Sequence, residues 1–186
     1  MAATVILSRL VLSGCLGMAK PTAAQIPPPA YQQATHGTGV PAEVLYAIAL
    51  QESATLIRGI LIPWPWTLNV AGKPYRFAHR AAACDALLLA IHDVGAKAVD
   101  AGLGQINMGW NGEHFAHPCE ALDPYRNLAV TTALLQQHKT SDTTWLDAAG
   151  RYHRPAGGLR ADRYRKSFAN HLSRITQLPF QGMKKP

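Results

Sequence analysis

Glu52 is the side chain in this sequence that points most directly to chemistry. It follows Leu45 and Ile48 at a spacing that places all three side chains on one face of a helix. Burial on an apolar face disfavours a carboxylate anion and raises the carboxyl pKa, and the negative end of the helix dipole acts in the same direction. A general acid that works near neutral pH needs such a raised pKa. The spacing alone also allows a glutamate at a frayed helix end, half in solvent.

Two further motifs follow Glu52 and Ser53 along the chain. Residues 102–107 read Gly-Leu-Gly-Gln-Ile-Asn, and residues 148–153 read Ala-Ala-Gly-Arg-Tyr-His. This ordered combination resembles the lysozyme-like soluble lytic transglycosylases (SLT domains) of bacterial cell walls, over about residues 35 to 175. The nearest resemblance is to the small transglycosylases encoded with conjugation and type IV secretion machinery.

The resemblance implies cleavage, without water, of the β-1,4 bond between N-acetylmuramic acid and N-acetylglucosamine in peptidoglycan. Glu52 is then the catalytic residue, which protonates the glycosidic oxygen and next accepts the proton of the muramic 6-hydroxyl group as a 1,6-anhydro ring closes. Tyr152 matches a tyrosine whose hydroxyl group orients the glutamate. The positions that the resemblance assigns to substrate binding are Ser53, Gly104, Gln105, Ile106, Asn107 and Tyr152. For Ser53, support of the helix end is the alternative to support of a substrate N-acetyl group. The reaction needs no metal ion and no organic cofactor.

The chain departs from the family pattern at two places. His153 stands where the family has an asparagine, and a longer segment ending at Asn69 replaces the usual stretch after Glu-Ser. Within that segment Trp66, with Trp64 and Tyr75, is expected to form a stacking platform for pyranose rings. The alternative is that these aromatic side chains form the local core of an inserted lobe.

Three other readings of the same residues stay open. A hydrolytic muramidase would use a second carboxylate about 5–10 Å from the first, and Asp100 and Glu113 are the nearest candidates along the chain to the glutamine motif. A peptidoglycan-binding assembly factor would keep the groove and dispense with the acid. A zinc site at Glu113, His114, His117 and Cys119 fits no familiar ligand spacing.

The elements that must position these residues are mostly helices. Helices are predicted from near Pro41 to Ser53, and over about 79–94, 123–138, 145–151 and 160–175. An irregular or β-rich insertion is predicted over 54–78, and a glycine-punctuated turn over 99–107. The expected fold is mainly α within the α+β class, lysozyme-like, with a small insertion. The expected division is 1–24 signal peptide, 25–34 extended lead-in, 35–176 transglycosylase domain and 177–186 basic tail.

The first residues and the cysteines predict export to the periplasm. Arg9, an apolar run over 10–19 and small residues ending at Ala24 have the form of a secretory signal peptide. A buried N-terminal helix is the alternative, and residues 12–15 also resemble a lipoprotein processing box that would anchor the chain at Cys15. Cys84 and Cys119 are expected to form a disulfide in an exported chain, with two free buried thiols as the alternative.

The formal net charge of +7 indicates an acidic polymer partner or simply a basic surface. Export makes nucleic acid an improbable partner, whereas the stem peptides of peptidoglycan carry carboxylates. The expected partners are therefore peptidoglycan glycan strands and, from the resemblance, components of an envelope-spanning secretion or conjugation apparatus.

Overall fold

The computed structural model describes residues 25–176, which form a mixed α+β fold. The predicted signal peptide, Cys15 and the basic tail lie outside the described residues. Within residues 25–176, no helix has both the length and the apolar character needed to cross a membrane. The helices are α1 (Pro29–Thr35), α2 (Ala42–Ser53), α3 (Arg80–Val94), α4 (Pro124–His138), α5 (Trp145–His153) and α6 (Leu159–Thr176). Short 3-10 helices are η1 (Ala96–Ala98), η2 (Gly112–His114) and η3 (Pro118–Leu122).

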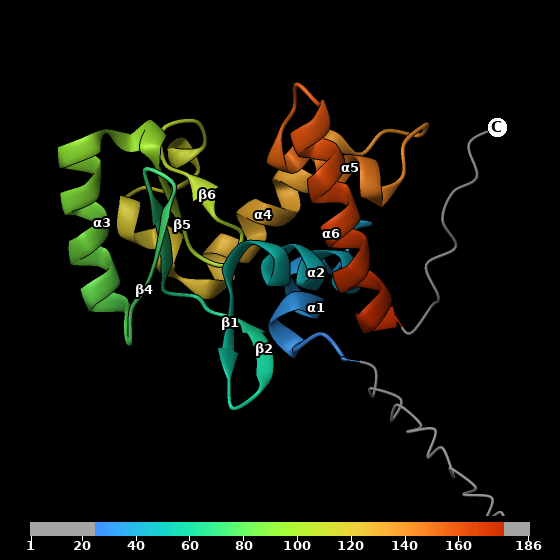
Figure 1. Ribbon diagram of the computed structural model, residues 1–186, viewed down its shortest axis with the longest axis horizontal. Coiled ribbons are helices and arrows are strands. Elements are labelled where there is room, and N and C mark those ends of the chain that lie inside the picture. Colours follow the sequence, from blue (N-terminus) through green and yellow to red (C-terminus); the bar gives the residue numbers. More distant parts are fainter. Residues whose placement is uncertain (1–24, 177–186) are drawn as a thin grey trace, which may run out of the picture.

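One half of the molecule, here called the helical lobe, consists of α1, α2, α5 and α6 (Figure 1). Its core is built on α2. Every residue of this helix is buried except the first two, Gln51 and Glu52. Leu45 and Ile48 are fully buried against Phe168 and other side chains of α6. The predicted helical face carrying Leu45 and Ile48 is therefore confirmed.

The other half, here called the sheet lobe, is a small antiparallel sheet covered by α3 (Figure 1). Its strands are β3 (Thr67–Val70), β4 (Lys73–Arg76), β5 (Val99–Ala101) and β6 (Ile106–Asn107), in the order β4-β3-β5-β6. A second hairpin, β1 (Ala54–Ile57) with β2 (Ile60–Pro63), projects below the two lobes. The β-rich insertion predicted over 54–78 is confirmed as these two hairpins, β1–β2 and β3–β4.

Helix α4 lies between the lobes and contributes to both cores. Leu135 belongs to the cluster of the helical lobe, and its neighbour Leu134 belongs to the cluster of the sheet lobe. The helix begins as predicted, because the Asp123 side chain accepts hydrogen bonds from the Tyr125 and Arg126 amides and Pro124 follows it directly. The two walls of any cleft between the lobes are thus joined by one continuous helix.

Two of the predicted elements are wrong. The extended lead-in over 25–34 ends at Pro28, because Pro29 opens α1, a position that suits proline. Burial of Tyr31 against Tyr46, with ring centroids 4.9 Å apart, holds this helix on the core. The turn predicted over 99–107 contains strands β5 and β6, which pair with each other around a tight turn.

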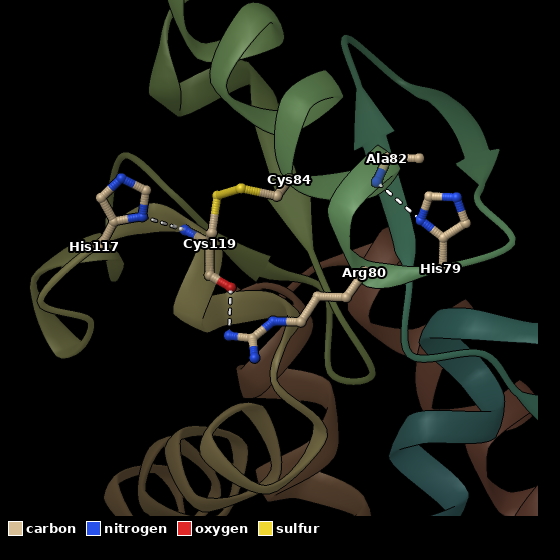
Figure 2. Close-up of a disulfide and its surroundings, with 6 residues drawn as sticks. All are labelled: His79, Arg80, Ala82, Cys84, His117 and Cys119. Atoms are coloured by element: carbon tan, nitrogen blue, oxygen red, sulfur yellow. Dashed lines mark hydrogen bonds between the residues drawn. A yellow bond between two sulfur atoms is a disulfide. The ribbon is translucent and has the colours of Figure 1, made fainter.

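The predicted disulfide is present and joins α3 to η3 within the sheet lobe (Figure 2). Arg80 of α3 donates a hydrogen bond of 3.1 Å to the Cys119 carbonyl oxygen, and the His117 ring accepts one of 3.2 Å from the Cys119 amide. The Cys119 sulfur is therefore not a thiolate ligand, and the zinc reading is wrong on this point. Within residues 25–176, no three His, Cys, Asp or Glu side chains are grouped so as to hold a metal ion.

Candidate active site

A cavity of about 710 Å³ lies between the two lobes and contains most of the predicted site residues. The helical lobe contributes Glu52, Tyr152 and His153, and the sheet lobe contributes side chains from three strands and the loop after β6. The lining residues are Glu52, Asn69, Asp100, Gln105, Ile106, Asn107, Trp110, Asn111, Leu134, Gln137, His138, Tyr152, His153, Arg154 and Pro155. A volume of this size is typical of a ligand-binding cleft.

Glu52 occupies the last turn of α2 and is held by one phenol. The Tyr164 hydroxyl group, from α6, donates a hydrogen bond of 2.6 Å to Glu52 Oε1. Burial raises the pKa of Glu52 to about 7; the hydrogen bond from Tyr164 opposes this rise, and the charge of Asp100 adds to it. Near neutral pH this carboxyl group can therefore both give and take a proton.

Tyr164, and not Tyr152, orients the glutamate. Tyr152 lines the cavity, but its hydroxyl group donates a hydrogen bond of 2.5 Å to the Gly104 carbonyl oxygen. In sequence Tyr164 belongs with Phe168 to the apolar stripe of the last predicted helix, so its role was missed. The one available signal is a hydroxyl group on a face that otherwise buries apolar side chains, where a polar atom needs a partner.

Ser53 and Gly104 support the site from behind. Ser53 is fully buried, and its hydroxyl group lies 2.9 Å from the carbonyl oxygens of Ala49 and Leu103, to which it donates. At Gly104 a Cβ atom would overlap the Thr131 hydroxyl group and lie 2.9 Å from the Tyr152 hydroxyl oxygen. These two residues therefore join the end of α2 to the turn after β5, and the hydrogen bonds of Ser53 fit the support of the helix end, one of its two predicted roles.

The turn itself is fixed by two amide side chains. Gln105 has φ of 48°, and its Nε2 donates to the Gly102 carbonyl oxygen at 2.8 Å and the Thr67 carbonyl oxygen at 3.1 Å. The buried Asn127 side chain accepts a hydrogen bond of 2.8 Å from the Gly104 amide and donates to two further carbonyl groups. Gln105 thus lines the cavity from a strained backbone position that local hydrogen bonds stabilise.

Asn107 connects a second carboxylate to the rim of the cavity. Its Nδ2 donates to Asp100 Oδ1 at 2.7 Å and to the Lys97 carbonyl oxygen at 3.0 Å. Its Oδ1 accepts from the amides of Gly109 and Trp110, both at 3.1 Å. All the hydrogen-bonding capacity of this amide is used within the protein, so Asn107 positions its neighbours. It also lines the cavity, and its direct contact with substrate stays a prediction.

Trp110 is an exposed aromatic side chain at the cavity, in addition to the predicted Tyr152, and belongs to none of the sequence motifs. Trp110 is 65% exposed at the rim, and Lys97 Nζ lies 4.2 Å from its ring centroid. Trp66 instead packs against the core of the sheet lobe and meets Trp64 edge to face at 5.5 Å. Trp66 is therefore part of the lobe core and not a cavity residue, and Tyr75, which is 46% exposed, does not line the cavity either. Ile106 is buried and closes the cavity wall.

His153 lies on the cavity, beside the phenol that holds Glu52. Its ring stacks on Tyr164 with centroids 4.5 Å apart and planes 7° from parallel. Burial lowers the pKa of His153, and the nearby Arg154 and Arg160 lower it further. A neutral imidazole therefore covers one face of the phenol that holds Glu52.

Comparison of the chain with models of known protein families gave no match, and no curated protein or solved structure matched it either. The chemistry of the cavity therefore has to be argued from its own residues. These residues present a carboxyl group with a pKa near neutrality, a second carboxylate, several amides and an exposed indole ring to one cleft. This combination can transfer a proton to a bound polar ligand that has flat apolar faces.

Proposed function

We propose that the protein is a peptidoglycan lytic transglycosylase with a lysozyme-like fold. It cleaves the β-1,4 bond between N-acetylmuramic acid and N-acetylglucosamine and forms a 1,6-anhydro sugar. The observation that carries this proposal is the Glu52 carboxyl group, which is raised in pKa to about 7, held by Tyr164 and turned to a cavity of about 710 Å³. The order of the motifs in the sequence gives the substrate class.

The chemistry needs one residue that acts twice. The protonated Glu52 gives its proton to the glycosidic oxygen, and the bond from the muramic C1 atom to that oxygen breaks with its electron pair going to the oxygen. The Glu52 carboxylate then takes the proton of the muramic 6-hydroxyl group while that oxygen bonds to C1. The hydrogen bond from Tyr164 stabilises the carboxylate between the two steps.

The rest of the cavity suits a peptide-bearing sugar strand. Asn69 and Gln105 offer amide groups to hydroxyl and N-acetyl groups, and the exposed Trp110 ring offers a flat face to a pyranose. Arg154 lies on the same cavity, and its positive charge favours substituents that carry carboxylates, as peptidoglycan stem peptides do.

A hydrolytic muramidase is the second candidate, and a specific observation favours it. Asp100, one of the two carboxylates considered for that reaction, lines the same cavity as Glu52, whereas Glu113 is exposed and is not among the lining residues. The two reactions differ in product mass, because the anhydro product is lighter than the hydrolysis product by one water molecule.

Export to the periplasm is part of the proposal. The pattern of residues 1–24 and the disulfide between Cys84 and Cys119 support it, since disulfides persist in oxidising compartments. Lipid anchoring at Cys15 is the alternative to signal-peptide cleavage. Service to a conjugation or secretion apparatus rests on the sequence resemblance alone.

The test is incubation of the full chain, produced by export, with purified peptidoglycan, followed by mass analysis of the released muropeptides. The wild-type protein is expected to release anhydro-muropeptides. Glu52→Gln is expected to lose turnover by about 10³-fold, within the range for a lost general acid, and still to bind glycan strands. Glu43→Gln, a carboxylate at the start of the same helix and outside the cavity, is the matched control and keeps its activity.

The outcomes separate the candidate functions. Release of muropeptides with an intact reducing end would favour the muramidase. Binding of strands without any turnover by the wild-type protein would favour the assembly factor and contradict the enzyme.

A further inference from the structure

We propose that Asp100 is a second catalytic carboxylate, which stabilises the positive charge that forms on the muramic sugar once Glu52 has protonated the linkage. This inference rests on the proposed function and adds to the single-glutamate reaction described above.

Asp100 faces the cavity because successive side chains of strand β5 point to opposite faces of the sheet. Val99 and Ala101 are fully buried in the core of the sheet lobe, so the side chain between them points to the opposite face of the strand. Asp100 lies opposite Asn69 of β3 and opposite Asn107 of β6. These three residues form a polar row across the sheet, and all three line the cavity.

The Asp100 carboxylate is held in place by a hydrogen bond, unlike a carboxylate on a freely exposed surface side chain. Its Oδ1 accepts the 2.7 Å hydrogen bond from Asn107, whose other three hydrogen bonds fix it to the backbone of Lys97, Gly109 and Trp110. No cation pairs with Asp100 among the salt bridges of the described residues. The carboxylate is therefore rigidly held and leaves its charge available to the cavity.

The two carboxyl groups affect each other across the cleft. The charge of Asp100 contributes to the raised pKa of Glu52, after the larger effect of burial. Burial also raises the pKa of Asp100, but the hydrogen bond from Asn107 opposes that rise. The larger rise at Glu52 favours the proton on Glu52 over Asp100, which is the division of roles that glycoside cleavage requires.

These two roles account for the proton, the electron pair and the positive charge during bond cleavage. When the bond between C1 and the glycosidic oxygen breaks, the leaving oxygen keeps the electron pair and the proton from Glu52. The positive charge is shared by C1 and the ring oxygen of the muramic sugar, and Asp100 stabilises it without forming a bond. The oxygen of the 6-hydroxyl group then attacks C1 and its proton returns to Glu52.

The test replaces Asp100 by asparagine, which keeps the shape and removes the charge. Turnover of peptidoglycan is expected to fall by about a hundredfold or more, the scale of a lost electrostatic stabiliser, with little change in strand binding. Because Asp100 raises the pKa of Glu52, the alkaline limb of kcat/KM is expected to move to lower pH in Asp100→Asn. A merely structural role would not move that limb.

The controls separate this inference from the proposed function. Glu113→Gln removes an exposed carboxylate outside the cavity and is expected to leave rate and pH profile unchanged. Asp100→Glu keeps the charge and is expected to restore part of the rate. If Asp100→Asn does not fold, Asp100→Ser is measured in the same way. Activity within threefold of wild type, or an unmoved alkaline limb, would overturn the inference while Glu52→Gln remains inactive. An inactive wild-type protein would overturn the proposed function and this inference together.

Discussion

The helical lobe and the sheet lobe each place one carboxyl group on the same cavity, in opposite kinds of surroundings. Glu52 stands at a helix end on a deeply apolar core and has a single phenol as its partner. Asp100 stands in a polar row of the sheet and accepts a hydrogen bond from an amide. The environment, more than the residue type, therefore decides which group keeps its proton.

The lobes also differ in how they are held together. The helical lobe relies on large buried side chains such as Phe168 and Leu45, whereas the small core of the sheet lobe is supplemented by the Cys84–Cys119 disulfide. The sheet lobe carries the exposed rim residue Trp110 and the hydrogen-bonded cluster around Asn107. We expect substitutions in the two lobes to have different consequences, as the following four experiments test.

The largest effect is expected from loss of the disulfide. A bond between cysteines 35 positions apart stabilises a protein by about 3–4 kcal/mol in the chain-entropy model. Urea unfolding of the Cys84→Ser/Cys119→Ser variant should show this loss, and hydrogen exchange should place it first in α3 and η3. A reducing agent should not destabilise the variant further. Equal loss of protection in α2 and α6 would contradict the distinction between the lobes.

A pH-dependent stability is expected from the helical lobe. The folded protein raises the pKa of Glu52 from 4.5 to about 7, so the stability that this group contributes is complete below pH 4.5 and is lost as pH rises through 7. Glu52→Gln cannot titrate and should gain up to about 3 kcal/mol relative to wild type between pH 4.5 and pH 8. Thermal unfolding at the two pH values measures the difference, with Glu43→Gln as control. A constant difference would show that Glu52 has an ordinary pKa.

Removal of the Tyr164 hydroxyl group should change both rate and pH profile. The hydrogen bond from Tyr164 lowers the pKa of Glu52, so Tyr164→Phe should raise that pKa and move the alkaline limb of kcat/KM to higher pH. The rate should fall by about tenfold, because a hydrogen bond to a carboxylate is lost. Tyr152→Phe is the matched control, since its hydroxyl group bonds to Gly104 and not to Glu52. An equal shift in both variants would remove the distinction between the two tyrosines.

The smallest effect is expected at the rim of the sheet lobe. Trp110→Ala should raise KM for glycan strands several-fold and leave kcat unchanged, because stacking at the rim contributes to binding and not to proton transfer. Its stability should stay within about 0.5 kcal/mol of wild type, since the side chain is mostly exposed. Trp66→Phe should behave oppositely, with lower stability and an unchanged KM. An unchanged KM for Trp110→Ala would contradict the stacking of a sugar ring on Trp110.

Local signals in the sequence were sufficient for most helices and for the placement of Glu52 at the end of α2. The start of α4 follows from Asp123 and Pro124. The place of Glu52 beside the core follows from its spacing to Leu45 and Ile48, which are fully buried. The partners of the acid could not be predicted in the same way. Tyr164 reaches Glu52 across 112 positions of sequence, and a helical pattern shows only that its face is buried.

Residues that act through their neighbours were the hardest to interpret. Asn107 and Ser53 match substrate-contacting positions in the family pattern, but their polar groups are directed to the protein's own backbone or to Asp100. Trp64 and Trp66 illustrate the same difficulty, because an aromatic cluster in sequence fits a lobe core as well as a sugar platform. The short helix α1 was missed because three consecutive prolines suggested an extended chain, while burial of Tyr31 favours the helix.

Helix α4 sets the width of the gap between the carboxyl groups. Leu134 and Leu135 are neighbours on α4, and their side chains are buried in different lobe cores. A rotation of one lobe relative to the other would therefore have to bend α4. The cleft is therefore expected to keep one width and not to close on its ligand. A polymer strand wider than the cleft would then be excluded at its entrance. To accept a bulkier strand, the protein would need smaller side chains on the cleft walls, because α4 joins the two lobes without a hinge.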